Sequence, residues 1–488
     1  MLARSFLPLL AVTFLAGGEP TTVPVRITVH PDQPGATIPS DFCGLSFEVA
    51  QLLPGTNGVH YFRPDNQPLL NLFHQLGIQN LRIGGNTSDR NVKQLPSEAD
   101  LDSLFAFAKA ANVKVIYCLR LYQGDPAEAA RTAKYIMDRY ASQLACFSIG
   151  QEPSAYPTEK VDTRAPLERM GTAAEKYSYA AYHDEWKRFA DTIIASVPQV
   201  RFCGPGVHNN ATWARKFLAD FSQSNHVVLC VMHLYAGGAG NKIPTPEIGR
   251  ERMLSGEFFK TYQKLYDGFV PLCLSNGIPY RLEEVNNYFN GGALDVSDTF
   301  ASALWGLEFM HWWAAHQAAG LNFHTGDKVA AGSTMGISRY TSYFTSTNGY
   351  QVRPLGYALK MFALGGHGRL LPVETTGDSQ LRLSAYAVLG DHGGLFVTVI
   401  NKEHGPAART IAATLSGTGN YRVARVIRLT SPKGDVAAKS GVTVGGAGIQ
   451  PNATWAGAWE PLKQTASAQG WAVQIRPASA AIVDLTSD

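Results

Sequence analysis

The sequence predicts an α/β protein, namely a (β/α)8 TIM barrel with a C-terminal all-β sandwich domain that an N-terminal strand completes. From about residue 42, short apolar runs alternate with longer amphipathic segments, as in repeated βα units that build a parallel sheet. Eight such runs are present, and eight strands close this kind of barrel. After about residue 365 the pattern changes to alternating apolar and polar residues between glycine-rich turns, which is typical of antiparallel strands.

The expected barrel strands are short, apolar and bounded by polar or glycine-containing segments. They span residues 42–48, 78–84, 113–120, 145–150, 200–204, 227–235, 278–284 and 320–325. Between them, Asp125 is expected to cap a helix that begins at Pro126. Helical patterns also cover residues 173–196 and 298–318. The second of these carries several aromatic residues, which we expect to pack against strands instead of binding a ligand: Trp305, Phe309, Trp312 and Trp313.

The 488 residues divide into four expected segments. Residues 1–18 have the layout of a signal peptide, with an early positive charge, an apolar run too short to span a membrane, and small residues at the end. We therefore expect a secreted or periplasmic protein without membrane attachment after cleavage. Residues 19–41 contain a strand that joins the β domain, residues 42–365 form the catalytic barrel, and residues 366–488 form the β-sandwich.

Composition excludes several kinds of protein. A hydrophobic content of 45% with 17% charged residues is ordinary for a globular protein, and a net charge of +3 without a Lys/Arg-rich run gives no reason to expect nucleic acid binding. Six cysteines allow up to three disulfides in an exported protein, but five lie in apolar strand candidates, where cysteine acts as a small buried hydrophobe. No pair has the spacing of zinc ligands, so neither a metal nor a cofactor is expected.

Two glutamates close the fourth and seventh expected strands. Glu152 lies in residues 149–153, Ile-Gly-Gln-Glu-Pro, and Glu284 in residues 280–287, Tyr-Arg-Leu-Glu-Glu-Val-Asn-Asn. Since the C-terminal strand ends of a barrel meet around one axis, these carboxyls are expected to face each other, which is what glycoside hydrolysis requires. A separation near about 5.5 Å predicts retention of configuration, and about 6.5–9.5 Å predicts inversion. The alternatives are that Glu152 is a surface glutamate before a proline turn and that Glu284 forms a structural ion pair with Arg281 or Arg82.

At these motifs the chain resembles retaining glycoside hydrolases of clan A, and more closely family 79, the β-glucuronidases and heparanases. The resemblance rests on residues 81–89, 149–153 and 282–293, of which the last, with its double glycine, is the most specific, and it covers nearly the whole mature chain. It implies that Glu284 is the nucleophile and Glu152 the acid/base of a double displacement through a covalent glycosyl-enzyme. Glu283 is the rival nucleophile, and strand alternation is expected to point one of the two away from the site.

The resemblance also implies roles for other residues. Arg82 would hold the nucleophile ionised and Tyr235 would hydrogen-bond it. The remaining substrate-binding candidates are Glu48, Asn86, Gln151, His233, Phe289, Asn290, Gly291, Gly292 and Tyr340, with Tyr343 as the second choice to Tyr340. Amides of the glycine turn and the tyrosine hydroxyl are expected to bind the glucuronate carboxylate, and Glu48 and Asn86 the sugar hydroxyls. The structural alternatives are a core ion pair, packed aromatics and a plain turn.

Two positions depart from the family pattern. Gln151 stands where the clan usually has Asn, whose amide contacts the sugar 2-hydroxyl, so the extra methylene requires a shifted backbone or a changed contact. Phe289 stands where heparanases tend to carry Tyr, which removes one hydroxyl. Either change can alter substrate preference, and Gln151 can lower the rate.

The expected function is therefore exo-acting, retaining hydrolysis of terminal β-linked glucuronic acid, without cofactor or metal, from glycans or small aryl glucuronides. The lack of a basic cluster disfavours heparanase-like endo-action on sulfated polymer. The alternatives are another clan A activity, such as an arabinofuranosidase, xylanase or glucosidase, or a catalytically impaired carbohydrate-binding protein. The sequence does not indicate an oligomeric state.

Overall fold

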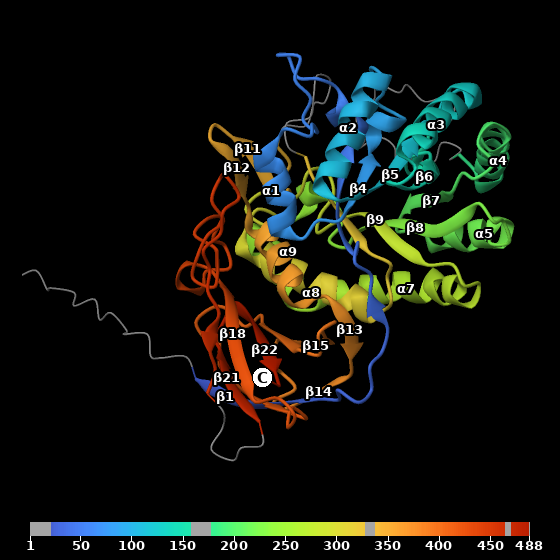
Figure 1. Cartoon of the computed structure of the whole chain (residues 1–488). Coiled ribbons are helices and arrows are strands. Elements are labelled where there is room, and N and C mark those ends of the chain that lie inside the picture. The colour runs from blue at the N-terminus through green and yellow to red at the C-terminus, as the bar shows by residue number, and fades with distance from the viewer. Residues whose placement is uncertain (1–20, 158–176, 327–336, 464–469, 488) are drawn as a thin grey trace, which may run out of the picture.

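The computed structural model describes residues 21–157, 177–326, 337–463 and 470–487, and Figure 1 shows a helix-surrounded barrel beside a smaller β domain. The expected signal peptide lies outside these described residues. Among the helices of the described part, none combines the length and apolar character that a membrane crossing requires.

Eight parallel strands close into the barrel, so the predicted fold class is confirmed. Going round the barrel, the strands are β10 (Leu321–His324), β3 (Cys43–Glu48), β4 (Asn80–Gly84), β5 (Lys114–Leu119), β6 (Leu144–Ile149), β7 (Phe202–His208), β8 (Val227–Tyr235) and β9 (Tyr280–Asn286). Each predicted strand corresponds to one of these. Because all eight are parallel, their C-terminal ends share one mouth of the barrel.

Strand β7 differs most from its prediction, since it runs on to His208 past the expected end at Gly204. Pro205 lies within the extension, although proline cannot donate to a strand ladder. The strand accommodates it at a register shift against β8, between Pro205 and Val207. This extension carries His208 to the barrel mouth.

Helices surround the barrel strands. They are α1 (Gln67–Leu76), α2 (Glu98–Ala111), α3 (Pro126–Tyr140), α4 (Tyr179–Ser196), α5 (Ala211–Phe221), α6 (Pro246–Leu254), α7 (Glu257–Ser275), α8 (Phe300–Ala315) and α9 (Pro354–Gly365). As predicted, Pro126 begins α3, and the carboxylate of Asp125 accepts the amide hydrogen of Ala127 at 3.0 Å. The aromatic face of α8 is core: three of its predicted packing residues are buried and Trp312 is partly buried.

The β domain consists of two sheets. One has the order β14 (Val373–Thr376), β1 (Thr22–Val29), β17 (Thr410–Ser416) and β21 (Trp471–Ile475). The other has the order β19 (Thr443–Val444), β18 (Val423–Thr430), β22 (Ser479–Thr486), β16 (Leu395–Asn401), β15 (Leu383–Leu389), β13 (Gly368–Leu371) and β2 (Thr37–Ile38), with β20 (Glu460–Pro461) beside β18. The N-terminal strand β1 pairs antiparallel with β14 and parallel with β17, as expected.

The larger sheet belongs to two hydrophobic cores. Along β22, Ala480 and Ile482 pack into the core shared with the barrel, whereas Val483 and Leu485 pack between the two sheets. This alternation follows from the two-residue period of a strand. Figure 1 shows helices α8 and α9 lying between the barrel strands and this sheet. The sheet is therefore covered on both faces, which fixes the β domain against the barrel.

A buried ion pair crosses the same contact. Lys402, just after β16, binds Glu308 on α8, and both side chains are almost fully buried. The hydroxyl of Ser384 on β15 also donates to Glu308. All six cysteines are buried and unpaired.

Candidate active site

The two predicted catalytic glutamates lie together at the barrel mouth. Glu152 follows β6 and adopts a left-handed backbone conformation with φ 47°, which is uncommon outside glycine and is found where a site constrains the chain. Its amide donates to the carbonyl of Gly206 at 3.0 Å, which ties this turn to β7. Glu284 lies in β9 near its C-terminal end. The backbone of each glutamate is thus held by an adjacent strand, that of Glu152 by β7 and that of Glu284 by β8, where it pairs with His233.

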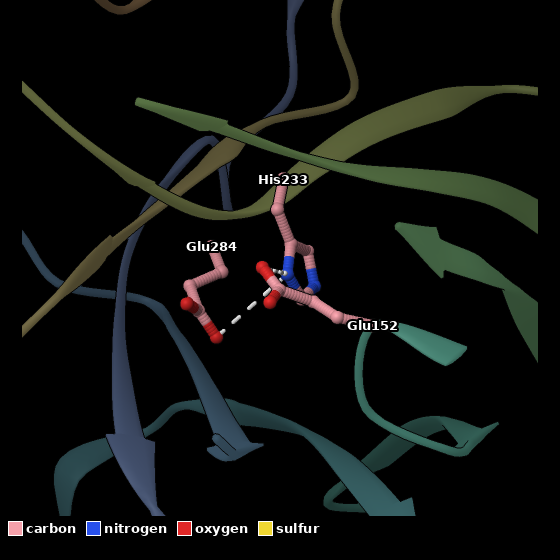
Figure 2. A group of neighbouring side chains, drawn as sticks. All are labelled: Glu152, His233 and Glu284. Carbon is pink, nitrogen blue, oxygen red and sulfur yellow. Dashed lines mark hydrogen bonds and ion pairs between the residues drawn. The ribbon is translucent and has the colours of Figure 1, made fainter. Parts of the chain in front are cut away.

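The two carboxyls are close enough to act on one bond. Ligand atoms of Glu152, His233 and Glu284 all lie within 4.8 Å of one another, and Figure 2 shows both carboxylates on the same side of the imidazole, near the same ring nitrogen. Nδ1 of His233 is 3.0 Å from Oε1 of Glu152 and 3.9 Å from Oε2 of Glu284. One oxygen of each carboxyl thus lies within 4.8 Å of the other, which is close enough for both to act on one bond, and retention of configuration stays a prediction.

Glu284 is surrounded by groups that favour its ionised form. Nη1 of Arg82 donates to Oε2 at 2.7 Å, and the hydroxyl of Tyr235 donates to Oε1 at 2.9 Å, as the sequence predicted. Burial alone would raise the pKa of Glu284, but the charges of His324, His233 and Arg82 and the bond from Tyr235 hold this pKa well below its usual range. The carboxylate is therefore prepared to act as a nucleophile.

Glu152 has a different environment. Its side chain is 18% exposed, whereas the Glu284 side chain is 7% exposed, so it has more access to solvent. Burial raises its pKa and the hydrogen bond and charge of His233 lower it, with the lowering larger, to about 2. Burial lowers the pKa of His233, but its carboxylate neighbours raise it to about 9. Such interacting groups titrate as a pair, so at a pH between these two pKa values Glu152 and His233 together hold one proton.

Glu283 does not point away from the site, so the expectation from strand alternation is wrong. Its Oε1 lies 3.4 Å from Nε2 of His233 and its Oε2 lies 3.9 Å from Nε of Arg82. The physical reason is a register shift between β8 and β9, where Met232 pairs with Leu282 but His233 pairs with Glu284. Glu283 is completely buried, whereas Glu284 keeps a small exposed area, which favours Glu284 as the group that reaches a substrate.

Gln151 bridges the nucleophile and its arginine. Its Oε1 accepts a short hydrogen bond from Arg82, and its Nε2 donates to Oε2 of Glu284 at 3.1 Å. Its backbone amide donates to Asp89 at 2.6 Å. The side chain thus reaches across to Glu284, and whether it contacts a sugar hydroxyl stays a prediction.

Glu48 binds the protein itself. Its carboxylate accepts the amide hydrogens of Asn86 at 3.2 Å and Thr87 at 2.7 Å, together with the Thr87 hydroxyl at 2.7 Å. These bonds hold the segment that follows β4 in place. Asn86 in turn accepts a short hydrogen bond from Arg90. The geometry gives Glu48 a structural role, and its contact with a sugar hydroxyl stays a prediction.

The expected carboxylate-binding residues lie beside the catalytic pair. The ring of Tyr340 is 6.1 Å from that of Tyr235, and Phe289 makes an edge contact with Tyr235 at 6.3 Å. Gly291 and Gly292 are buried at left-handed φ values of 76° and 88°, where a side chain is strained. A Cβ on Gly292 would also come within 3.0 Å of the backbone nitrogen of residue 340, so the turn packs directly on the candidate tyrosine.

Two other candidates are arranged differently. Asn290 is exposed and has a φ of 59°, so it shapes the turn before the two glycines. Tyr343 is buried against Tyr350, and its hydroxyl accepts a hydrogen bond from Tyr61 at 3.3 Å. The first choice, Tyr340, is thus the tyrosine that lies beside Tyr235.

Three residues of the site were not predicted. Nη2 of Arg90 lies 3.3 Å from Oε2 of Glu152, and Nδ1 of His324 lies 3.9 Å from Oε2 of Glu284. His208 makes edge contacts with both Tyr235 and Phe289. The two histidines end strands β7 and β10, and a polar side chain at a barrel strand end is the signal that would have found them.

The site also contains the group of described residues whose geometry suits a metal ion, namely Glu152, His233 and Glu284. Arg82 already supplies a positive charge 2.7 Å from Glu284, and His233 hydrogen-bonds Glu152. We therefore interpret the group as a hydrogen-bonded acid/base cluster, and the absence of a metal stays a prediction.

Two comparisons concern the sequence of the chain. No family model matches the chain. A β-glucuronidase of Aspergillus niger is 26% identical over 199 residues, which cover 38% of this chain and 35% of that protein, so the match spans about a third of the length of the relative.

Solved structures agree over nearly the whole chain. A 4-O-α-L-rhamnosyl-β-D-glucuronidase from Fusarium oxysporum 12S superposes with a TM-score of 0.68 at 17% identity, covering 95% of this chain and 99% of that one. A family 51 arabinofuranosidase from Xanthomonas axonopodis pv. citri gives 0.65 at 15% identity, covering 95% and 100%. At these identities the likeness establishes the fold, a TIM barrel with a C-terminal sandwich.

Proposed function

We propose that this chain is a retaining, exo-acting β-glucuronidase of the family 79 type. The observation that carries the proposal is the spacing of Glu152 and Glu284, whose carboxylate oxygens come within 4.8 Å at the barrel mouth. The matched relative is named a β-glucuronidase, and one structural neighbour is a rhamnosyl-glucuronidase. Both names support the substrate class.

In the proposed reaction, Glu284 attacks the anomeric carbon while Glu152 gives a proton to the leaving oxygen. Arg82, Tyr235 and Gln151 hold Glu284 ionised and oriented. In the second step Glu152 takes a proton from water, and the resulting hydroxide displaces the enzyme carboxylate, so that the configuration is retained.

The substrate carboxylate is proposed to bind beside Tyr340, where Gly292 packs against the backbone of the tyrosine and Gly291 accepts a hydrogen bond from the amide of Arg339. Amide hydrogens and a hydroxyl are suitable donors to a carboxylate without a full countercharge. With the terminal glucuronic acid bound there, the glycan or the small aryl aglycone extends out of the mouth. Export by residues 1–18 is a further proposal, which N-terminal sequencing of protein recovered from outside the cytoplasm tests.

The deciding experiment measures nitrophenol release from nitrophenyl β-glucuronide, β-glucoside and α-arabinofuranoside by the unmodified protein. We expect turnover of the glucuronide alone, and proton NMR of the first-formed sugar should show the β-anomer. Preferred turnover of the arabinofuranoside would replace the proposal with the activity named for the family 51 neighbour. Binding of glucuronate without turnover of any substrate would indicate a carbohydrate-binding protein.

A further inference from the structure

Glu283 is a buried carboxylate that the proposed reaction does not use. It is completely buried, and neither of its oxygens accepts a hydrogen bond from any described residue. A buried carboxylate needs a nearby positive charge, because ionisation is costly away from water. The two candidates are Nε2 of His233, 3.4 Å from Oε1, and Nε of Arg82, 3.9 Å from Oε2.

Arg82 is shared between two buried carboxylates. Its guanidinium pairs with Glu284 at 2.7 Å and is 3.9 Å from Glu283 at its nearest. His324 also approaches Glu284, whereas the second cationic side chain near Glu283 is His233. His233 is completely buried, and its Nε2, which makes no hydrogen bond within the described residues, lies on the side of the ring that faces Glu283.

The opposite nitrogen of His233 faces the acid/base, at 3.0 Å from Oε1 of Glu152. Figure 2 shows this edge of the imidazole turned toward Glu152. The imidazole thus lies between one carboxylate that can meet substrate and one that cannot. The charged and titratable groups around it are Glu152, Glu283, Glu284, Arg82 and His208.

We propose that Glu283 is a positioning residue that keeps a proton on Nε2 of His233, so that Nδ1 shares a second proton with Glu152. The inference rests on the proposed function and deepens it. When the shared proton moves from Nδ1 to Oε1 of Glu152, His233 becomes neutral and its Nε2–H still points to Glu283. Glu152 is then the protonated acid that bond cleavage requires, and the number of protons on the pair has not changed.

The hydrogen bond and charge of His233 favour the ionised form of Glu152, and the arrangement explains how Glu152 can still act as an acid. The form with Glu152 ionised and His233 protonated interconverts with the reactive form by one proton transfer across 3.0 Å. The pair then loses its proton only at the alkaline pKa of His233, which its carboxylate neighbours raise to about 9 against the effect of burial. Glu283 supplies part of that increase.

The test compares pH profiles of kcat/KM for nitrophenyl glucuronide. Glu283→Gln keeps an acceptor for Nε2–H but removes the charge, so the alkaline limb should move to lower pH by about one unit or more. Glu283→Asp keeps a more distant charge, so its alkaline limb should lie between those of the unmodified protein and Glu283→Gln. Glu308→Gln is the matched control, because it changes a buried carboxylate outside the site and should leave the limb unmoved. Identical limbs for all four proteins would overturn the inference.

Imidazole 15N NMR gives a readout that does not depend on turnover. We expect His233, assigned by its loss in His233→Asn, to titrate well above pH 6.5 in the unmodified protein and at lower pH in Glu283→Gln. Equal titration in both proteins rejects the role of Glu283. If the titration shifts but no glucuronide is hydrolysed, the role of Glu283 stands and the proposed function fails.

Discussion

The barrel mouth and the contact between barrel and sandwich both bury charged side chains, but these side chains find hydrogen-bond partners in one region more fully than in the other. At the contact, Lys402 binds Glu308, which also accepts a hydrogen bond from Ser384. At the mouth, Nε of Arg82, Nε2 of His233 and both oxygens of Glu283 make no hydrogen bond within the described residues.

The difference separates two uses of buried charge. A closed pair such as Lys402 and Glu308 specifies how two parts of the fold meet, and removing one partner leaves an unpaired charge. An excess of closely spaced carboxylates shifts proton affinities, which catalysis needs and stability alone does not. Substitutions in the mouth should therefore change chemistry first, and substitutions at the contact should change stability first.

The largest expected effect is that of Glu284→Gln, which should lower kcat/KM for a glucuronide by at least about 10⁴-fold, because an amide cannot form the glycosyl-enzyme. Differential scanning calorimetry should show a folded protein with a modestly lower unfolding temperature near neutral pH, since the favourable interactions of ionised Glu284 with Arg82 and the two histidines are removed. Glu308→Gln is the matched control and should retain activity. Activity of Glu284→Gln within tenfold of the unmodified protein would reject the assignment.

Lys402→Met should show the opposite behaviour. It leaves Glu308 buried without a partner, so the free energy of unfolding should fall by about 3–5 kcal/mol. Below the unfolding temperature, kcat/KM should be unchanged. The double change Lys402→Met with Glu308→Leu should recover much of the stability in denaturant titrations, and failure to recover would show that the packing of Lys402, not its charge, is what matters.

Gln151→Asn gives a smaller effect in the mouth. The shorter amide cannot reach Arg82 and Glu284 together, so we expect kcat/KM to fall about tenfold, which corresponds to about 1.4 kcal/mol. Gln143→Asn, at a partly buried position just before β6 and outside the mouth, is the control. A higher kcat in Gln151→Asn would mean that the bridge limits the reaction instead of assisting it.

The smallest expected effect concerns acid stability. The folded-state pKa of Glu284 lies well below the ordinary value of 4.5, so its contribution to stability is present above about pH 4.5 and is lost as pH falls toward the folded value. Glu284→Gln should remove this loss and flatten the stability curve by up to about 1.4 kcal/mol per pH unit. Unfolding temperatures measured from pH 3 to 6 check this, and parallel curves would contradict it.

The sequence predicted much of the fold and the centre of the site. The eight barrel strands are continuous apolar runs, because parallel strands are buried on both faces. Glu152 and Glu284 were identifiable because strand ends converge in a barrel. The direction of Glu283 was not, since the register shift that turns it inward depends on how β9 pairs with β8. Arg90 reaches Glu152 only because Glu48 holds the segment after β4, which is a contact between distant residues.

The pairing of β1 with β17 imposes an order on biosynthesis. Thr28 and Ser416, which bond across these strands, are 388 residues apart in the chain. At about 5–20 residues per second, the ribosome needs roughly 20–80 s to deliver the partner after β1 has emerged. Until β14 and then β17 emerge, Val25, Ile27 and Val29 have no neighbouring strand to cover them, and the barrel that precedes both partners in the chain can form first. Limited proteolysis of stalled nascent chains should therefore cleave β1 until β17 has left the ribosome.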